Sequence, residues 1–175
     1  KVQQARSNFF QKFLSAAGIR KRYDFVTFHQ SYSYESFIEG IRPEYIAATK
    51  GIDYSPKDGV FKALCGKAER HPEKQYAIFI DEINRGNISE IFGELISLLE
   101  VDKRAGEAGA LSAVLPYSKT EFSVPPNINV YGTMNTADRS IDQIDIALRR
   151  RFKFQPMLPD AGIIENELNL QGIDA

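Results

Sequence analysis

Residues 76–82 read YAIFIDE, an apolar run that ends on two adjacent carboxylates. A short apolar run without alternation predicts a strand buried on both faces, as in a parallel sheet. Similar aromatic and β-branched runs occur at 23–28 (YDFVTF) and 128–134 (INVYGTM). Ligands bind beyond the carboxyl ends of parallel strands. We therefore expect the functional edge to hold the residues that follow the strands, which are His29 and Gln30, Asp81 and Glu82, and Asn135.

Helices are predicted between these strands. Their signals are apolar residues at helical spacing and capping residues at the first turn. The predicted helices cover 2–17, 59–70 after a cap at Asp58, the stretch from an Asn87–Glu90 capping box to Leu99, and the stretch from a Ser140–Gln143 box to Phe152. Strands that alternate with helices are typical of α/β proteins with a mostly parallel sheet.

The remaining segments have weaker signals, because Gly, Pro and polar residues interrupt them. The predictions here are mostly loop over 29–57 with a short helix near 34–39 and a hairpin around Gly51, a long insertion over 102–127 with hairpin strands at 114–117 and 121–124, and a final strand at 152–155.

Composition excludes several classes of protein. Lys and Arg total 22 of the 175 residues and Asp and Glu total 23, for a net charge of −1, which argues against a general polyanion-binding surface. One cysteine and two histidines exclude a disulfide framework within the chain and leave little for a zinc site. No apolar run approaches the ~20 residues of a membrane span, and the first residues lack a signal-peptide pattern. We therefore expect no membrane contact and a cytoplasmic location.

The pair Asp81–Glu82 suits nucleotide hydrolysis. Mg²⁺ is held by one or two carboxylates plus phosphate oxygens, and a second carboxylate can deprotonate an attacking water. Asn135, after the next strand, could hold that water or the γ-phosphate. From the residues alone two other interpretations stay open: an exposed turn for the carboxylates, and a turn or helix cap for Asn135.

Three consecutive arginines, Arg149, Arg150 and Arg151, end the last predicted helix. Successive helical residues lie about 100° apart, so not all three can face one partner. One or two could reach a neighbouring subunit's phosphates as an arginine finger. Alternatively, they stabilise the negative end of the helix dipole. No phosphate-binding loop of the form GxxxxGK[ST] occurs, because Gly66–Lys67 is followed by Ala68 and lies in a predicted helix.

Several strings of the sequence are far more specific than these single features. They are FHQSYSYE at 28–35, GIRP at 40–43, DGVF at 58–61, IDEINRGN at 80–87, MNTADRS at 134–140 and ALRRRF at 147–152. In this order they resemble the McrB family of AAA+ domains, the GTP-hydrolysing motor subunits of modification-dependent restriction systems. The resemblance covers roughly residues 23–158.

The resemblance implies a role for each matching position. Asp81 would be the Walker B carboxylate that holds Mg²⁺ through water, and Glu82 the catalytic glutamate. Asn135 would be the sensor-1 residue that contacts the nucleotide. Asp138 and Arg139 would belong to a loop that bears on nucleotide hydrolysis and on the activating partner. Arg150 and Arg151 fall where the family's inter-subunit arginines lie, and Asn84 and Arg85 would face the subunit interface.

The resemblance also implies cofactors and partners. They are GTP, with ATP possible, Mg²⁺, further copies of the chain in a ring that is hexameric in the family, an McrC-like nuclease subunit, and DNA bound through domains outside this chain. Two alternatives stay open, a MoxR-like AAA+ ATPase and a non-catalytic ring-assembly module.

The sequence departs from the family pattern, because it has no phosphate-binding loop, helical lid or DNA-reading domain. We therefore expect an α/β AAA+ P-loop NTPase core that lacks its Walker A strand and lid. Residues 1–158 would be a partial core, and 159–175 a linker or the start of the lid. The encoded protein is expected to continue in both directions, and the chain alone to be inactive.

Overall fold

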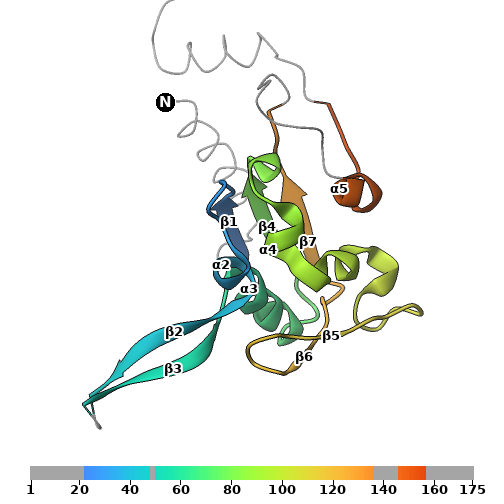
Figure 1. Cartoon of the computed structure of the whole chain (residues 1–175). Helices are drawn as coiled ribbons and strands as arrows, with labels where there is room; N and C mark the ends of the chain where they lie inside the picture. The colour runs from blue at the N-terminus through green and yellow to red at the C-terminus, as the bar shows by residue number, and fades with distance from the viewer. Residues whose placement is uncertain (1–21, 48–49, 136–145, 157–175) are drawn as a thin grey trace, which may run out of the picture.

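The computed structural model describes residues 22–47, 50–135 and 146–156. A three-stranded parallel sheet lies at its centre, in the order β1-β4-β7 (Figure 1). The strands are β1 (Tyr23–Thr27), β4 (Tyr76–Asp81) and β7 (Ile128–Gly132). Thr27 pairs with Asp81, and Ile80 pairs with Gly132. The predicted α/β fold with a parallel sheet is confirmed, with its strands where the apolar runs placed them.

The central strand β4 is buried along its whole length, because it has a strand on each side and side chains on both faces. Tyr76, Ile78 and Ile80 point into the larger hydrophobic core. Ala77 and Phe79 lie on the opposite face in a smaller cluster. Burial on both faces explains why this strand shows no polar alternation in the sequence.

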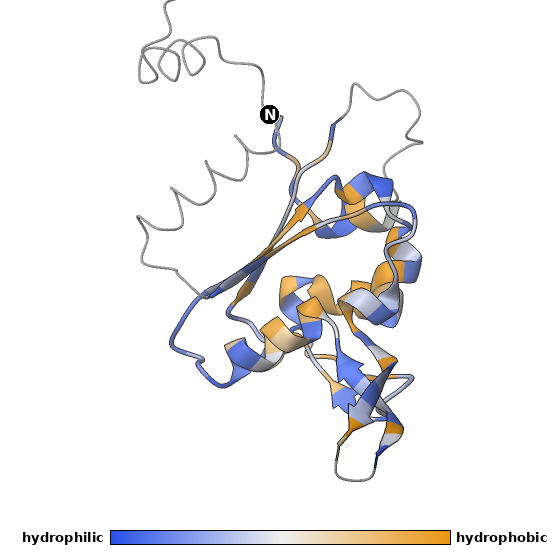
Figure 2. Ribbon diagram, turned by 90° about the vertical axis from the view of Figure 1, so that its left-hand side faces the viewer, coloured by the Kyte–Doolittle hydropathy of each residue, from blue (hydrophilic) through white to orange (hydrophobic). Residues whose placement is uncertain are grey.

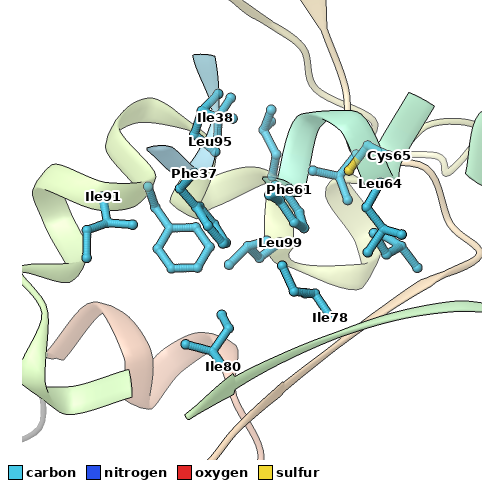
Figure 3. Packing of buried hydrophobic residues seen from close by; sticks show 14 of the residues in the cluster. Phe37, Ile38, Phe61, Leu64, Cys65, Ile78, Ile80, Ile91, Leu95 and Leu99 are labelled. Carbon is cyan, nitrogen blue, oxygen red and sulfur yellow. The ribbon is translucent and has the colours of Figure 1, made fainter. Parts of the chain in front are cut away.

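Helices cover one face of the sheet (Figures 1 and 2). They are α2 (Tyr34–Phe37), α3 (Val60–Glu69), α4 (Ile88–Phe92) and the 3₁₀ segment η2 (Gly93–Leu99). Phe37 and Phe61 stack with ring centroids 5.2 Å apart, above Ile78 and Ile80 of β4 (Figure 3). Phe92 meets the edge of Phe37 at 4.9 Å. This aromatic packing fixes the helical layer on β4.

The loop predicted over 29–57 is wrong for most of its length. β2 (Glu39–Ile46) and β3 (Gly51–Asp58) form a long antiparallel hairpin that reaches away from the sheet (Figure 1). The short helix and the hairpin expected around Gly51 are present. Cross-strand pairs put six apolar residues on one face of the hairpin, namely Ile41 with Pro56, Pro43 with Tyr54, and Tyr45 with Ile52. Two of these six are prolines, which hid the strand alternation.

The insertion is anchored to the hairpin base by one buried carboxylate. Glu39 is fully buried and accepts hydrogen bonds from Lys62 Nζ at 2.7 Å and from the backbone N–H groups of Tyr117 and Ser118 at 3.0 and 2.8 Å. The hairpin predicted in the insertion is confirmed, but its strands are short, β5 (Ala113–Val114) and β6 (Glu121–Phe122).

Two predicted helix boundaries need correction. The N-cap of α3 is Gly59, not Asp58, because Asp58 is the last residue of β3. The helix capped by Asn87, whose Oδ1 accepts from the N–H of Glu90, ends at Phe92. Gly93 has φ +53° and lies against the Tyr34 ring, so the chain continues as η2 instead of α-helix.

The end of the described chain also differs from the prediction. α5 (Ile146–Arg151) is the last described helix. Residues 152–155 form no strand, because no described strand pairs with them. Elsewhere in the chain, two 3₁₀ turns complete the described elements, η1 (Ile83–Arg85) and η3 (Val101–Lys103). The helix predicted at 2–17, the Ser140–Gln143 box and residues 159–175 lie outside the described residues. Among the described helices, none has the length and apolarity that a membrane crossing requires.

Candidate functional site

The carboxyl ends of the three parallel strands meet at one edge of the sheet, as predicted. The N–H of Phe28, after β1, donates to the Asp81 carbonyl at 2.9 Å. On the other side of β4, the N–H of Thr133 donates to the Ile80 carbonyl at 2.9 Å. The residues after β1, β4 and β7 are therefore neighbours, because the parallel register aligns the three strand ends.

Asp81 lies at the centre of this edge. It is 5% exposed, and its Oδ1 accepts a hydrogen bond from the hydroxyl of Thr133 at 2.5 Å. Burying a carboxylate is costly unless it is hydrogen-bonded or paired with a cation. The position therefore suits a carboxylate that holds a ligand at the sheet edge.

Glu82 follows in a strained backbone conformation. Its φ of 53° and ψ of 46° are left-handed, which is uncommon for a residue with a side chain and concentrates at functional sites. The side chain is 16% exposed, and its Oε2 lies 3.4 Å from Nε of Arg85, one turn along η1. The left-handed conformation of Glu82 ends β4 at Asp81, so the two successive carboxylates lie at the turn between β4 and η1.

The other residues predicted at the edge have different environments. Asn135 is exposed, two residues beyond Thr133. His29 and Gln30 are exposed after β1, and the His29 ring lies edge-on to Tyr32 at 5.6 Å. Asp138 and Arg139 lie outside the described residues.

The three arginines of α5 separate into two kinds. Arg149 and Arg150 are exposed. Arg151 is 14% exposed, with Nε 3.1 Å from Glu100 Oε1, and its Nη2 donates to Ser97 Oγ at 3.1 Å. In this conformation Arg151 ties α5 to the end of η2 in its own chain.

The carboxylates at the carboxyl edge suit Mg²⁺, which needs few protein ligands, better than a metal ion that needs three or four. Among the described residues, no group of three or more His, Cys, Asp or Glu side chains gathers around one point. Mg²⁺ keeps several waters and takes one or two carboxylates plus phosphate oxygens. Asp81, buried and already oriented, is the residue that would hold the ion.

One residue of the edge was missed by the sequence analysis. Thr133 makes three hydrogen bonds around the Asp81–Glu82 turn. Besides the bonds from its N–H to the Ile80 carbonyl and from its hydroxyl to Asp81, its carbonyl accepts from the N–H of Ile83 at 3.0 Å. The available signal was its position, one residue past β7 and therefore beside Asp81 in a parallel register. A threonine at the end of a β-branched strand gives no other sign of a special role.

Comparison with known proteins identifies a matching family and two similar restriction-enzyme components. Residues 4–152 match the family described as "AAA domain (dynein-related subfamily)". The chain is 49% identical over 142 residues to the "Type IV methyl-directed restriction enzyme EcoKMcrB subunit" of Escherichia coli (strain K12), covering 79% of this chain and 29% of that protein. It is 27% identical over 160 residues to the "Type II restriction enzyme BsuMI component YdiS" of Bacillus subtilis (strain 168), covering 74% of this chain and 46% of that protein. The chain thus spans less than half the length of either relative.

Proposed function

This chain belongs to the AAA domain family, dynein-related subfamily, and we propose that it is the catalytic part of a nucleoside-triphosphate-hydrolysing motor in a restriction system. The observation that carries the proposal is the Asp81–Glu82 turn, held beside Thr133 at the carboxyl edge of the sheet. The similarity to two restriction-enzyme components supports the biological setting.

In the proposed reaction, the residues of the sheet edge act on one nucleotide. Asp81 would hold Mg²⁺, and the ion would supply positive charge that offsets the charge of the nucleotide's phosphates. Glu82 accepts a proton from the attacking water as a general base. Asn135, Asp138 and Arg139 would contact the nucleotide or the attacking water. An exposed arginine of α5 would reach the site of a neighbouring subunit.

Hydrolysis by the full-length protein with Glu82→Gln tests this assignment. The amide cannot accept the proton, so the turnover number should fall by ~10²–10⁴-fold, the usual range for a positioned general base. Glu107→Gln is the matched control, because Glu107 is exposed in the insertion, and it should retain wild-type turnover. Wild-type turnover in Glu82→Gln would contradict the role of Glu82.

The nucleotide and the partners are the finer part of the proposal. We propose GTP as the substrate, a ring of identical subunits, and an McrC-like nuclease that acts on modified DNA bound by other domains. Hydrolysis measured with GTP and with ATP, with and without the nuclease subunit, tests these points. Preference for ATP would favour a MoxR-like ATPase, and ring assembly without hydrolysis would favour a non-catalytic module.

A further inference from the structure

Thr133 is joined to the Asp81–Glu82 turn at three successive points. Its N–H donates to the carbonyl before Asp81, its hydroxyl donates to the Asp81 carboxylate, and its carbonyl accepts from the N–H after Glu82. The two backbone bonds would form with any residue except proline at this position. The hydroxyl bond is the part that requires Ser or Thr.

The hydroxyl bond matters because of what a carboxylate can do with its two oxygens. An ionised carboxylate has about four acceptor sites, so the bond from Thr133 to Oδ1 occupies one and leaves capacity for a metal-bound water. It also fixes the plane of the carboxylate, which otherwise rotates with little resistance about its last torsion angle. Partners of this kind orient the groups that hold a metal.

We propose that Thr133 is a positioning residue for the Asp81 carboxylate, and that its hydroxyl sets the affinity of the site for a divalent cation bound with a nucleoside triphosphate. The inference rests on the proposed function, because it assigns Asp81 to the metal. It adds Thr133, the residue after β7, as the partner that orients the carboxylate of Asp81 at the end of β4. In this role Thr133 acts through the Asp81 carboxylate, to which its hydroxyl donates.

The test compares three substitutions of one residue in the full-length protein. Thr133→Val keeps the shape and removes the hydroxyl, Thr133→Ala removes the hydroxyl without adding a methyl group, and Thr133→Ser keeps the hydroxyl. Thr27→Val is the matched control. Thr27 is paired with Asp81 on the β1 side, and its side chain makes no hydrogen bond to the described residues.

The primary readout is the affinity for Mn²⁺, measured by electron paramagnetic resonance in the presence of a non-hydrolysable GTP analogue. We expect Thr133→Val and Thr133→Ala to weaken it by about 10–100-fold, the usual loss when a partner of a metal-holding group is removed. Thr133→Ser should restore it to within about threefold, and Thr27→Val should match the wild type. The Mg²⁺ concentration for half-maximal hydrolysis should rise in the same order.

A purely structural role gives a different pattern. It would lower the melting temperature of both hydroxyl-free variants without changing Mn²⁺ affinity in the folded fraction, and that result would overturn the inference. Hydrolysis and Mn²⁺ binding that are wild-type in Thr133→Ala would overturn it while leaving the proposed function intact. A wild-type protein that binds no Mn²⁺ with nucleotide would overturn both.

Discussion

At the scale of single residues, Glu39 is the most deeply buried charged side chain among the described residues. It lies at the base of the hairpin and joins that base to α3 through Lys62 and to the insertion through two backbone N–H groups. Burial alone would raise the pKa of this carboxyl. The bonds from Lys62, Ser118 and Tyr117 outweigh burial and lower the pKa from 4.5 to about 2.

This lowered pKa predicts a specific loss of stability in acid. The unfolded carboxyl takes up a proton near pH 4.5 and the folded one only near 2. The stabilisation is therefore complete above pH 4.5 and is lost as the pH falls toward 2. Between pH 5 and pH 3 the free energy of unfolding should fall by about 2 kcal/mol on account of Glu39. Urea unfolding followed by circular dichroism at these two pH values measures the change.

Glu39→Gln provides the comparison for this prediction. It should be less stable than the wild type at pH 7, because the partly buried Lys62 loses one of its two carboxylate partners and keeps only Asp58. It should also lose less stability between pH 5 and pH 3. The exposed Glu107→Gln should keep the wild-type dependence on pH. An equal acid loss in Glu39→Gln and in the wild type would show that other groups cause it.

The arginines of α5 give a second residue-scale prediction. Arg151→Ala removes the contacts to Glu100 and Ser97, so amide hydrogen exchange in α5 should become faster. Arg150→Ala removes an exposed side chain and should leave that exchange unchanged. If Arg150 is the arginine finger, its loss should reduce hydrolysis by ~10³–10⁵-fold. Equal loss of hydrolysis in Arg151→Ala, with unchanged exchange in α5, would instead assign the finger to Arg151.

At the scale of elements, the sequence predicted the strands that have a clear hydrophobic pattern. It failed for segments whose structure depends on whether another strand lies beside them. β1, β4 and β7 lie where the sequence predicted them, because short apolar runs with aromatic and β-branched residues are typical of strands in a buried sheet. Among the described strands, β2 and β3 pair only with each other, and the hairpin projects from the fold, so its alternation, interrupted by Pro43 and Pro56, does not mark a core-facing strand. The predicted strand at 152–155 has the opposite problem, since its residues favour extension but no described strand lies beside it.

The candidate site also combines features that the sequence predicts with features that depend on neighbouring elements. The placement of Asp81, Glu82 and Asn135 at one edge follows from parallel strand order and was predictable. The role of Thr133 depends on which strand lies beside β4 and on the register between them. The inward turn of Arg151 depends on where η2 ends, and the helix prediction over that region did not include the break at Gly93.

Two glycines provide an element-scale prediction with opposite signs. Gly93 has φ +53°, and a Cβ there would lie 3.1 Å from the Tyr34 ring, so Gly93→Ala should lower the free energy of unfolding by about 1–3 kcal/mol. Gly66 lies within α3 with room for a methyl group, so Gly66→Ala should raise it by about 0.5–1 kcal/mol. Chemical unfolding of both variants checks the signs. A stable Gly93→Ala would mean that α4 can continue as α-helix through this position.

At the scale of the whole molecule, the two edges of the sheet have different tasks. At the amino edge, the Asn127 side chain donates to the carbonyls of Ala68, His71 and Lys74, and Arg104 donates to those of Leu99 and Ile128. These bonds tie the ends of α3 and η2 to the start of β7. The carboxyl edge instead holds Asp81 and the strained Glu82. A strained conformation such as that of Glu82 persists only where the surrounding structure holds it, and the amino-edge bonds are part of that framework.

The last prediction concerns the assembly of several chains. If the general base and the arginine finger of one site come from neighbouring subunits, Glu82→Gln and Arg150→Ala proteins should each be inactive alone and recover activity when mixed. A site is complete where an Arg150→Ala subunit supplies Glu82 and its neighbour supplies Arg150. In random equimolar rings about a quarter of the sites meet this condition. GTP hydrolysis, with mixed rings verified by mass photometry, measures the recovery.

A mixture of Glu82→Gln with the double variant Glu82→Gln/Arg150→Ala should stay inactive, because no subunit supplies the base. Mixed rings without recovery would place both groups in one subunit.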